Sequence, residues 1–242
     1  MSGIAPAQEE AKGHPGLIFV PGVEVATTLV HNVEVHILGY FLDPSNPTLV
    51  STLEHLRRSR VERAQKILEK LKSLRLPLSW KRVLELSGGE SLGRPHIAEA
   101  MVEQGYVTDL RQAFAQYIGR GRPAYVERDH LSPEEGVRLI RDSGGLPVLA
   151  HPLDIDAQPL EPILRRLKRQ GLVGMEAYYG DYTPDKVCRL AALAAKLGLI
   201  PLGGSDYHGL EEGSDTLLGS IDIPREAVDR FLALAPRPLT AG

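Results

Sequence analysis

The sequence predicts an α/β fold in which parallel strands alternate with helices, arranged as an incomplete barrel. Three consecutive helix-to-strand passages in the second half of the chain indicate this fold, because such alternation is typical of parallel sheets. Short apolar runs that end in Asp, Glu or His are a second indication, since barrel enzymes take site residues from the C-terminal ends of several strands. The 242 residues can bury a substantial core, and one domain with an insertion is favoured over two equal domains.

The first passage is the most clearly delimited one. We expect a helix over 133–142, because Ser132 suits its N-cap and two glutamates in its first turn suit the helix dipole. Gly144 and Gly145 end this helix, and an apolar strand over 146–150 follows them.

The same pattern recurs twice towards the C-terminus. Helices are expected over 162–170 and 182–197, each closed by a glycine, with strands over 173–177 and 199–202. Cys188 is the only cysteine, so an intramolecular disulfide is excluded, and we expect it to pack in the core rather than to act as a nucleophile.

The first half of the chain begins with two strand-like runs. An apolar run over 17–22 leads to Glu24, and we expect a strand over 17–20. Over 33–40 the residues alternate between two faces. One face carries Val33, Val35 and Ile37, and the other carries Glu34, His36 and Leu38.

A charged helical segment separates these strands from the rest of the barrel. The stretch 49–116 has helical periodicity with a break at 76–78, so we expect a helical insertion there and a barrel formed by 1–48 and 117–242. The segment contains a basic run, which is more often a solvated helix face than a nucleic-acid surface. The run consists of Arg57, Arg58, Arg60 and Arg63.

Ligand-type side chains stand at the ends of four of these runs. Asp206 and His208 are two residues apart after a glycine turn, so in a strand they would point to the same face. Glu24, His36 and His151 follow or end other apolar runs. Taken singly, each has a structural explanation, such as an edge carboxylate, a strand histidine or a turn residue. Together they predict a metal site, and mixed oxygen and nitrogen donors suit zinc, manganese or iron.

These motifs resemble the polymerase-and-histidinol-phosphatase (PHP) family of metal-dependent phosphoesterases. The resemblance covers about residues 3–224 and includes a subgroup related to bacterial nucleoside 3',5'-bisphosphate phosphatase and 5'-to-3' exoribonuclease. The metal motifs that carry it are Gly22-Val23-Glu24, His36-Ile37-Leu38-Gly39-Tyr40, Ala150-His151-Pro152 and Gly204-Ser205-Asp206-Tyr207-His208. The subgroup motifs are Ser91-Leu92-Gly93-Arg94-Pro95-His96-Ile97-Ala98 and Gly121-Arg122-Pro123-Ala124-Tyr125-Val126.

The chain departs from the family at its beginning. The family's leading His-x-His and Asp-His motifs are absent from this sequence, so the resemblance implies a distorted (β/α)7-type PHP barrel that lacks its first strands. A misassigned start, a trimmed product and a natural truncation would all look the same in this sequence.

The resemblance also implies an activity and the residues that perform it. The expected reaction is hydrolysis of a nucleotide phosphoester, either a 3',5'-bisphosphonucleotide or the 5' end of a short RNA, by metal-activated water. Two or three divalent ions are expected per complete site. Manganese is the expected metal, and iron or zinc are the alternatives. The implied metal ligands are Glu24, His36, His151, Asp206 and His208; the implied catalytic residues are Glu24, His151 and Asp206; the implied phosphate-binding residues are Arg94, His96 and Arg122. The alternative is a catalytically impaired remnant with a metal-binding, structural or regulatory role.

The composition is ordinary for a globular protein. The formal net charge of −3 provides no global attraction to nucleic acid, so no stable DNA complex is expected. We also expect no membrane segment and a cytoplasmic location, because the chain contains neither a signal-type apolar core nor a long apolar stretch.

Overall fold

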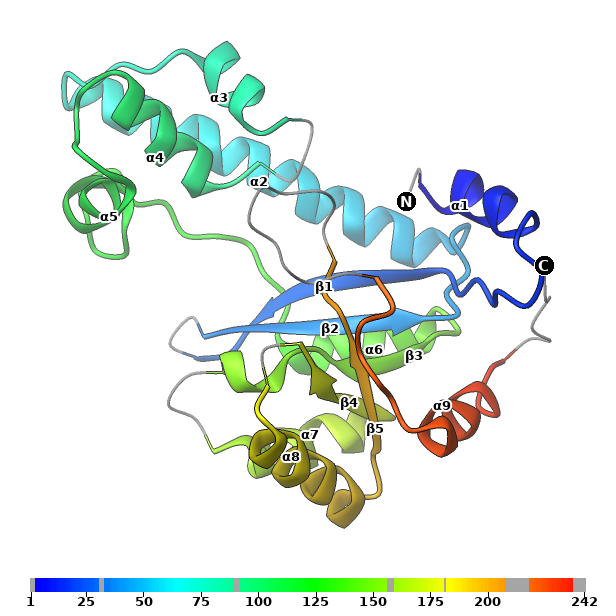
Figure 1. Ribbon diagram of the computed structural model, residues 1–242. Helices are drawn as coiled ribbons and strands as arrows, with labels where there is room; N and C mark the ends of the chain where they lie inside the picture. Colours follow the sequence, from blue (N-terminus) through cyan, green and yellow to red (C-terminus); the bar gives the residue numbers. More distant parts are fainter. Residues whose placement is uncertain are drawn as a thin grey trace. The chain divides into compact units, whose positions relative to one another are not determined.

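The computed structural model describes residues 3–30, 33–88, 92–155, 159–180, 182–207 and 218–236, which form a mixed α/β fold (Figure 1). The chain divides into two compact units, one formed by residues 1–50 and 131–242 and the other by Ser51–His130. The division into a barrel and an insertion at residues 49 and 116 stays a prediction. Among the described residues, no helix is both long and apolar enough to cross a membrane.

In the described part of the chain, a five-stranded sheet organises the first unit. Its strands are β1 (Gly22–Thr28), β2 (Glu34–Tyr40), β3 (Leu146–Leu149), β4 (Gly174–Tyr179) and β5 (Ile200–Gly204), and they lie in this order. The expected parallel pairing is confirmed for β3 with β4 and for β4 with β5. The pairs β1–β2 and β2–β3 are antiparallel, and β1 reaches β2 through a short connection, whereas a parallel crossover needs a dozen or more residues. The described strands therefore form a mixed sheet, and the (β/α)7 barrel stays a prediction.

The first strand lies later in the chain than the apolar run suggested. The expected strand over 17–20 is wrong, because β1 begins only at Gly22, and Leu17 and Ile18 are 50% and 40% exposed. The residues that β1 does bury are Val25 and Thr27, which alternate with more exposed neighbours. On β2, Val35 and Ile37 are buried, as the alternating pattern predicted.

The helices of the first unit follow the predicted passages. Helix α6 (Pro133–Asp142) begins at Ser132, whose hydroxyl accepts a hydrogen bond from the amide of Glu135 in a capping box, which confirms the predicted start. Helices α7 (Leu160–Gln170) and α8 (Pro184–Leu197) each end at a glycine in the left-handed region.

Cys188 is a correction to the expected packing. Its side chain is exposed on α8, because the buried stripe of that helix is formed by Leu190, Ala194 and Leu197 instead.

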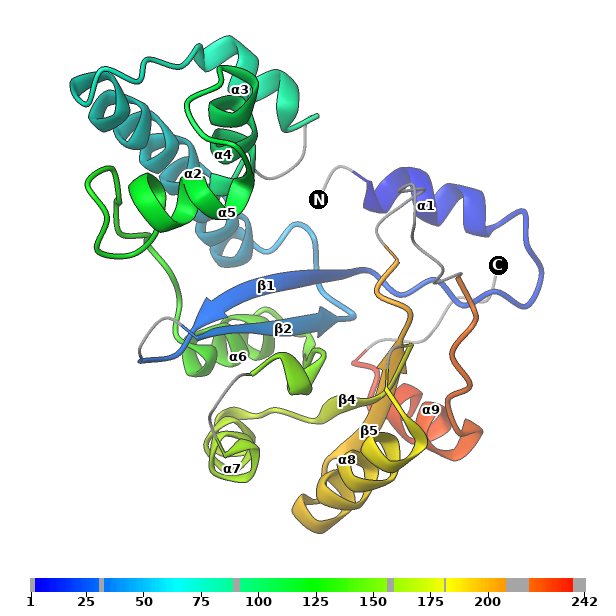
Figure 2. The ribbon, with the colours of Figure 1, turned by 60° about the vertical axis from the view of Figure 1, so that its left-hand side comes forward.

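The two faces of the sheet are covered differently. Helix α6 packs on one face, where Gly136 permits close approach, since a Cβ there would meet Cγ2 of Thr27 at 2.7 Å. On the other face, Phe231 of α9 (Arg225–Leu232) packs against Tyr40 with ring centroids 5.2 Å apart. Figure 2 shows α6 beside the β1–β2 pair and α9 next to β5. Helix α1 (Ile4–Ala11) and the 3-10 turn η3 (Pro152–Asp154) complete the elements of this unit.

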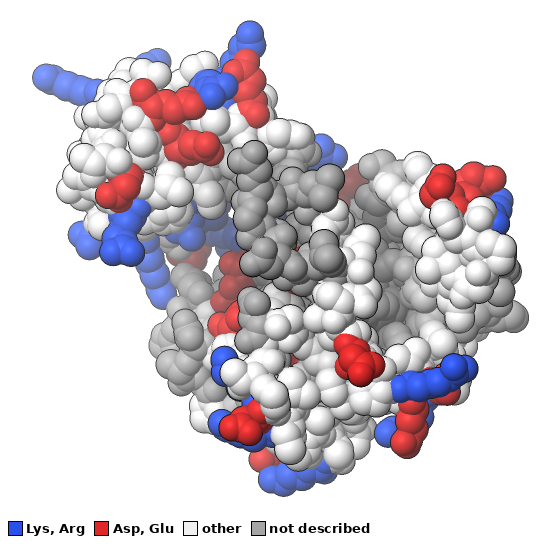
Figure 3. Space-filling model, viewed as in Figure 1, with Lys and Arg blue, Asp and Glu red and all other residues white. Residues whose placement is uncertain are grey.

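The secondary-structure elements in the described part of the second unit are all helices. It contains most of α2 (Pro47–Ser73), followed by α3 (Trp80–Leu86), α4 (Arg94–Glu103), α5 (Leu110–Ala113) and the π-helix η2 (Phe114–Ile118). The predicted break at 76–78 is confirmed, since it falls between α2 and α3. The unit has its own apolar core, which includes Ile67, Leu71, Ile97 and Met101. Acidic and basic side chains are interspersed over its surface on the face shown in Figure 3.

Candidate metal centre

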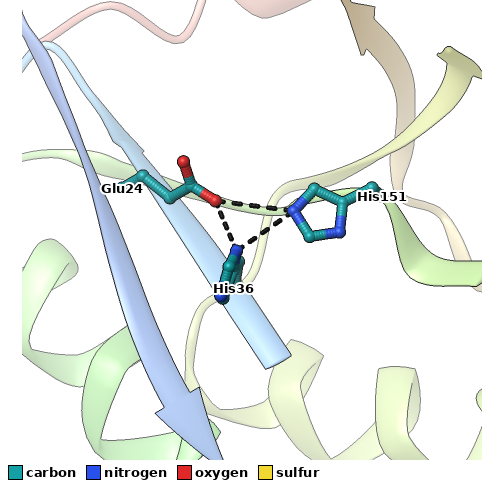
Figure 4. Close-up of side chains that lie close together, drawn as sticks. All are labelled: Glu24, His36 and His151. Atoms are coloured by element: carbon teal, nitrogen blue, oxygen red, sulfur yellow. Dashed lines mark hydrogen bonds and ion pairs between the residues drawn. The ribbon is translucent and has the colours of Figure 1, made fainter. Parts of the chain in front are cut away.

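Three ligand-type side chains of the first unit point towards one another (Figure 4). Oε1 of Glu24 lies 2.5 Å from Nδ1 of His36 and 3.4 Å from Nε2 of His151. The two ring nitrogens are 3.1 Å apart, and the rings meet edge to face. The side chains are 31%, 27% and 13% exposed in the order Glu24, His36 and His151, so the group is reachable from solvent and partly desolvated. We call these three residues the triad.

The sheet register brings the triad together. Glu24 faces Leu38 across the β1–β2 pair and His36 faces Ala26, so Glu24 and His36 are diagonal neighbours on the same face. His151 joins them because the amide of Ala150 donates a hydrogen bond to the carbonyl of His36 at 3.0 Å. Of the three triad residues, only His151 follows the C-terminal end of a strand, β3. Glu24 lies near the start of β1, and it reaches His36 through the antiparallel pairing of β1 with β2. The expectation that site residues gather at C-terminal strand ends therefore does not account for Glu24.

The triad is strongly coupled electrostatically. Hydrogen bonds from His151 and His36 hold the pKa of Glu24 well below its usual range, against the opposing effect of burial. Hydrogen bonds to Glu24 and then to Glu34 raise the pKa of His36 to about 9, and a hydrogen bond to Glu24 raises the pKa of His151. Without a metal, the Glu24 carboxylate is therefore ionised at neutral pH, and the imidazole of His36 is in its doubly protonated, positively charged form.

The donor set of the triad fits a transition metal. Two imidazole nitrogens and one carboxylate oxygen are the ligands that zinc, manganese and iron accept. Donors about 2.1 Å from a tetrahedral ion lie about 3.4 Å from each other. The separations of His151 from Glu24 and His36, 3.4 and 3.1 Å, are close to that value, and only the 2.5 Å contact between Glu24 and His36 has to open. The triad thus offers up to three ligands to one divalent ion.

A further carboxylate, that of Glu176, adjoins the triad and was not among the predicted site residues. Oε2 of Glu176 accepts a hydrogen bond from the amide of His151 at 2.7 Å, and the residue is only 4% exposed. Burial raises the pKa of this carboxyl group. The sequence did contain the signal, because Glu176 follows Val173-Gly174-Met175 in the same pattern of an apolar run before an acid.

Asp206 lies apart from the triad, beyond the end of β5. The strand ends at Gly204, and Asp206 has a φ of 50°, so the alternation expected for residues 206 and 208 does not reach it. The hydroxyl of Tyr179 donates a hydrogen bond to Oδ2 of Asp206 at 2.9 Å, and the Tyr179 ring is 6.0 Å from that of His151. His208, the other predicted ligand at this end, lies outside the described residues.

The predicted phosphate-binding residues belong to the second unit. Arg94 is the first residue of α4 and stacks over the rings of Phe114 and Tyr125, 5.3 and 5.9 Å from their centroids. His96 accepts a hydrogen bond from the amide of Gly93 through Nδ1, so that nitrogen caps the helix. Arg122 is exposed in the turn that precedes Tyr125.

Two arginines of the basic run on α2 lie beside this group. Arg60, Arg63 and Arg94 line a small pocket of about 20 Å³ at the start of α4. The guanidinium of Arg63 lies 5.9 Å from the Tyr125 ring, and burial lowers its pKa to about 10. A solvated helix face therefore describes only part of the run.

Known proteins resemble this chain over most of its length. It is 31% identical over 225 residues to a 3',5'-nucleoside bisphosphate phosphatase of Chromobacterium violaceum, covering 92% of this chain and 78% of the relative. It is 32% identical over 208 residues to the 5'-3' exoribonuclease Rnm of Escherichia coli, covering 85% and 71% respectively. No family model matches the chain.

Two solved structures are also similar to this chain over most of its length. A Bifidobacterium adolescentis protein proposed to be a metal-dependent phosphoesterase superposes with a TM-score of 0.74 at 30% identity, over 95% of this chain and 81% of that one. A Chromobacterium violaceum structure described as an amidohydrolase, with sulfate bound and no metal, superposes with a TM-score of 0.71 at 29% identity, over 94% and 83%.

The fold, the triad and these relatives place the chain in the class of metal-dependent phosphoesterases. It belongs to the PHP family, as its motifs indicated.

Proposed function

We propose that this protein hydrolyses nucleotide phosphoesters in a metal-dependent reaction, with a 3',5'-bisphosphonucleotide or the 5' end of a short RNA as substrate. The observation that carries the proposal is the convergence of Glu24, His36 and His151 on one point, in a chain 31% identical to a 3',5'-nucleoside bisphosphate phosphatase. In this proposal the sheet is part of a PHP barrel of the (β/α)7 type.

The triad residues hold the metal, and Asp206 and His208 add further ligands. A bound divalent ion, manganese first and iron or zinc as alternatives, would activate water and neutralise charge on the phosphoryl oxygens. The low pKa of Glu24 keeps its carboxylate charged and ready to bind a cation. The hydroxyl of Tyr179 orients the carboxylate of Asp206 through its hydrogen bond.

Recognition of a substrate phosphate is assigned to Arg94, Arg122 and His96. Guanidinium groups bind phosphate oxygens in a bidentate manner, and the aromatic rings beside Arg94 limit the directions in which its side chain can turn. The Nε2 atom of His96 is the ring nitrogen that remains for a substrate, because Nδ1 caps α4.

The test is hydrolysis by the purified protein, stripped of metal and reloaded with manganese, iron or zinc. We expect release of phosphate from 3',5'-bisphosphoadenosine, or of nucleotide from a short 5'-phosphorylated RNA, and loss of at least about a hundredfold in turnover for Glu24→Ala and His151→Ala. Asp222→Asn, an exposed carboxylate of the same unit, is the control and should retain full activity. No turnover of either substrate with any metal would contradict the proposal. Metal binding without turnover would favour the impaired, metal-binding alternative.

A cyclic phosphodiester is a second candidate substrate. The chain is 30% identical over 197 residues to a phosphoribosyl 1,2-cyclic phosphate 1,2-diphosphodiesterase of Eggerthella lenta, covering 80% of this chain and 74% of that protein. A ribose cyclic phosphate therefore belongs in the same assay, and a higher kcat/KM for it than for the bisphosphonucleotide would favour this second candidate.

A further inference from the structure

We propose that Glu34 and Asp154 are positioning residues that hold the two triad histidines in opposite tautomers. His36 would carry its proton on Nε2 and His151 on Nδ1, so that Nδ1 of His36 and Nε2 of His151 both present lone pairs to a metal. This inference rests on the proposed metal centre and names two residues that the sequence did not assign to it.

Glu34 contacts the outer nitrogen of His36. Nε2 of His36 lies 3.1 Å from Oε1 of Glu34, whereas Nδ1 faces Glu24 and His151. The strand itself provides this arrangement, because residues two apart on β2 point to the same face. A carboxylate accepts hydrogen bonds only, so it favours the tautomer with a proton on Nε2.

Asp154 contacts His151 in the reverse sense. Nδ1 of His151 lies 2.8 Å from Oδ2 of Asp154, whereas Nε2 faces Glu24 and His36. The 3-10 turn η3 provides this arrangement. The amide of Asp154 donates a hydrogen bond to the carbonyl of His151 at 3.1 Å, and in a 3-10 turn side chains three residues apart lie nearly above one another. Asp154 therefore favours a proton on Nδ1 of His151.

The turn that carries Asp154 is fixed at two points. The amide of His151 donates to Oε2 of the buried Glu176 at 2.7 Å, and the amide of Leu153 donates to the hydroxyl of Tyr182 at 3.1 Å. These bonds hold the backbone at His151 and at Leu153, and so support the contact between Asp154 and His151.

Both carboxylates therefore act on the ring atom remote from the cluster. Carboxylates that accept from a ligating histidine set its tautomer and orientation and make it a better donor, and their loss typically weakens metal binding 10–100-fold. Glu34 is 55% and Asp154 is 65% exposed, so solvent screens them and we expect the lower end of this range, about tenfold for each.

The experiment measures zinc binding and ring tautomers, without a turnover assay. Zinc affinity is determined by competition with a chelating dye for the wild type, Glu34→Ala and Asp154→Ala, with Glu226→Gln and Asp222→Asn as surface controls in the same unit. Long-range ¹H–¹⁵N spectra of the zinc-loaded protein report which nitrogen of each histidine carries hydrogen.

We expect zinc to bind about tenfold more weakly to each alanine variant than to the wild type. The two control variants should bind zinc as tightly as the wild type. The wild-type spectra should show His36 protonated on Nε2 and His151 on Nδ1, and Asp154→Asn should bind more tightly than Asp154→Ala, because an amide oxygen still accepts. Circular dichroism checks that each variant is folded, and the wild-type spectra test the inference even if a variant is not. The opposite tautomers, or zinc affinities within twofold of the wild type, would overturn this inference and leave the proposed function intact. A wild-type protein that binds no zinc, manganese or iron at the triad would overturn both.

Discussion

The pKa of His36 in the metal-free protein provides the most direct test of the triad. Its pKa is raised from 6.5 to about 9, first by the hydrogen bond to Glu24 and then by the one to Glu34. This difference corresponds to about 3 kcal/mol of preferential stabilisation of the protonated ring, an upper value because the side chain is 27% exposed.

The sign of the effect on stability follows from this direction. A raised folded-state pKa means that His36 contributes to stability fully below pH 6.5 and that the contribution is lost as the pH rises through about 9. The low pKa of Glu24 acts in the opposite sense, contributing above about pH 4.5 and losing its effect as the pH falls further. The metal-free triad should thus stabilise the fold most between about pH 4.5 and 6.5.

The assay is an NMR titration of the histidine ring protons in the presence of a chelator, with His36 assigned from the spectrum of His36→Gln. We expect a wild-type midpoint near 9, a fall of more than about one pH unit in Glu24→Gln and a smaller fall in Glu34→Gln. Glu69→Gln, an exposed residue of the second unit, should leave the midpoint unchanged. A Glu24→Gln midpoint equal to that of the wild type would refute the coupling of these two side chains.

Three further outcomes are expected. Gly136→Ala should lower the free energy of unfolding by about 1–3 kcal/mol in urea denaturation, although alanine favours helix, because the new Cβ would meet Thr27 at 2.7 Å; a more stable variant would contradict the tight α6–sheet contact. Zinc at about 100 times its Kd should stabilise the wild type by about 2.7 kcal/mol in thermal denaturation and should stabilise His151→Ala much less, and equal effects would place the bound zinc elsewhere. Arg94→Lys should raise KM for a 3',5'-bisphosphonucleotide about tenfold and should change KM for a simple phosphomonoester little. Arg111→Lys, at an exposed residue of the same unit, is the control and should leave both KM values unchanged. Equal changes for both substrates in Arg94→Lys would argue against phosphate recognition by Arg94.

Local patterns determined much of the fold. The structure confirms the capping of α6 at Ser132, the glycine ends of α7 and α8, and the alternation on β2. Each of these features depends on residues that are close together in the sequence. Cys188 shows the limit of such reasoning, because which side of α8 is buried depends on what packs against the helix.

The sequence also predicts the members of the triad, since its motifs indicate Glu24, His36 and His151 as metal ligands. The sequence does not predict their convergence, because it depends on antiparallel pairing of β1 with β2 and on the register that sets Glu24 opposite Leu38. Sequence periodicity shows which residues share a face of one strand, but a shift in register by one residue would turn Glu24 to the opposite face. Only the tertiary structure decided this register, and only its contacts show Asp154 and Glu176 adjoining His151.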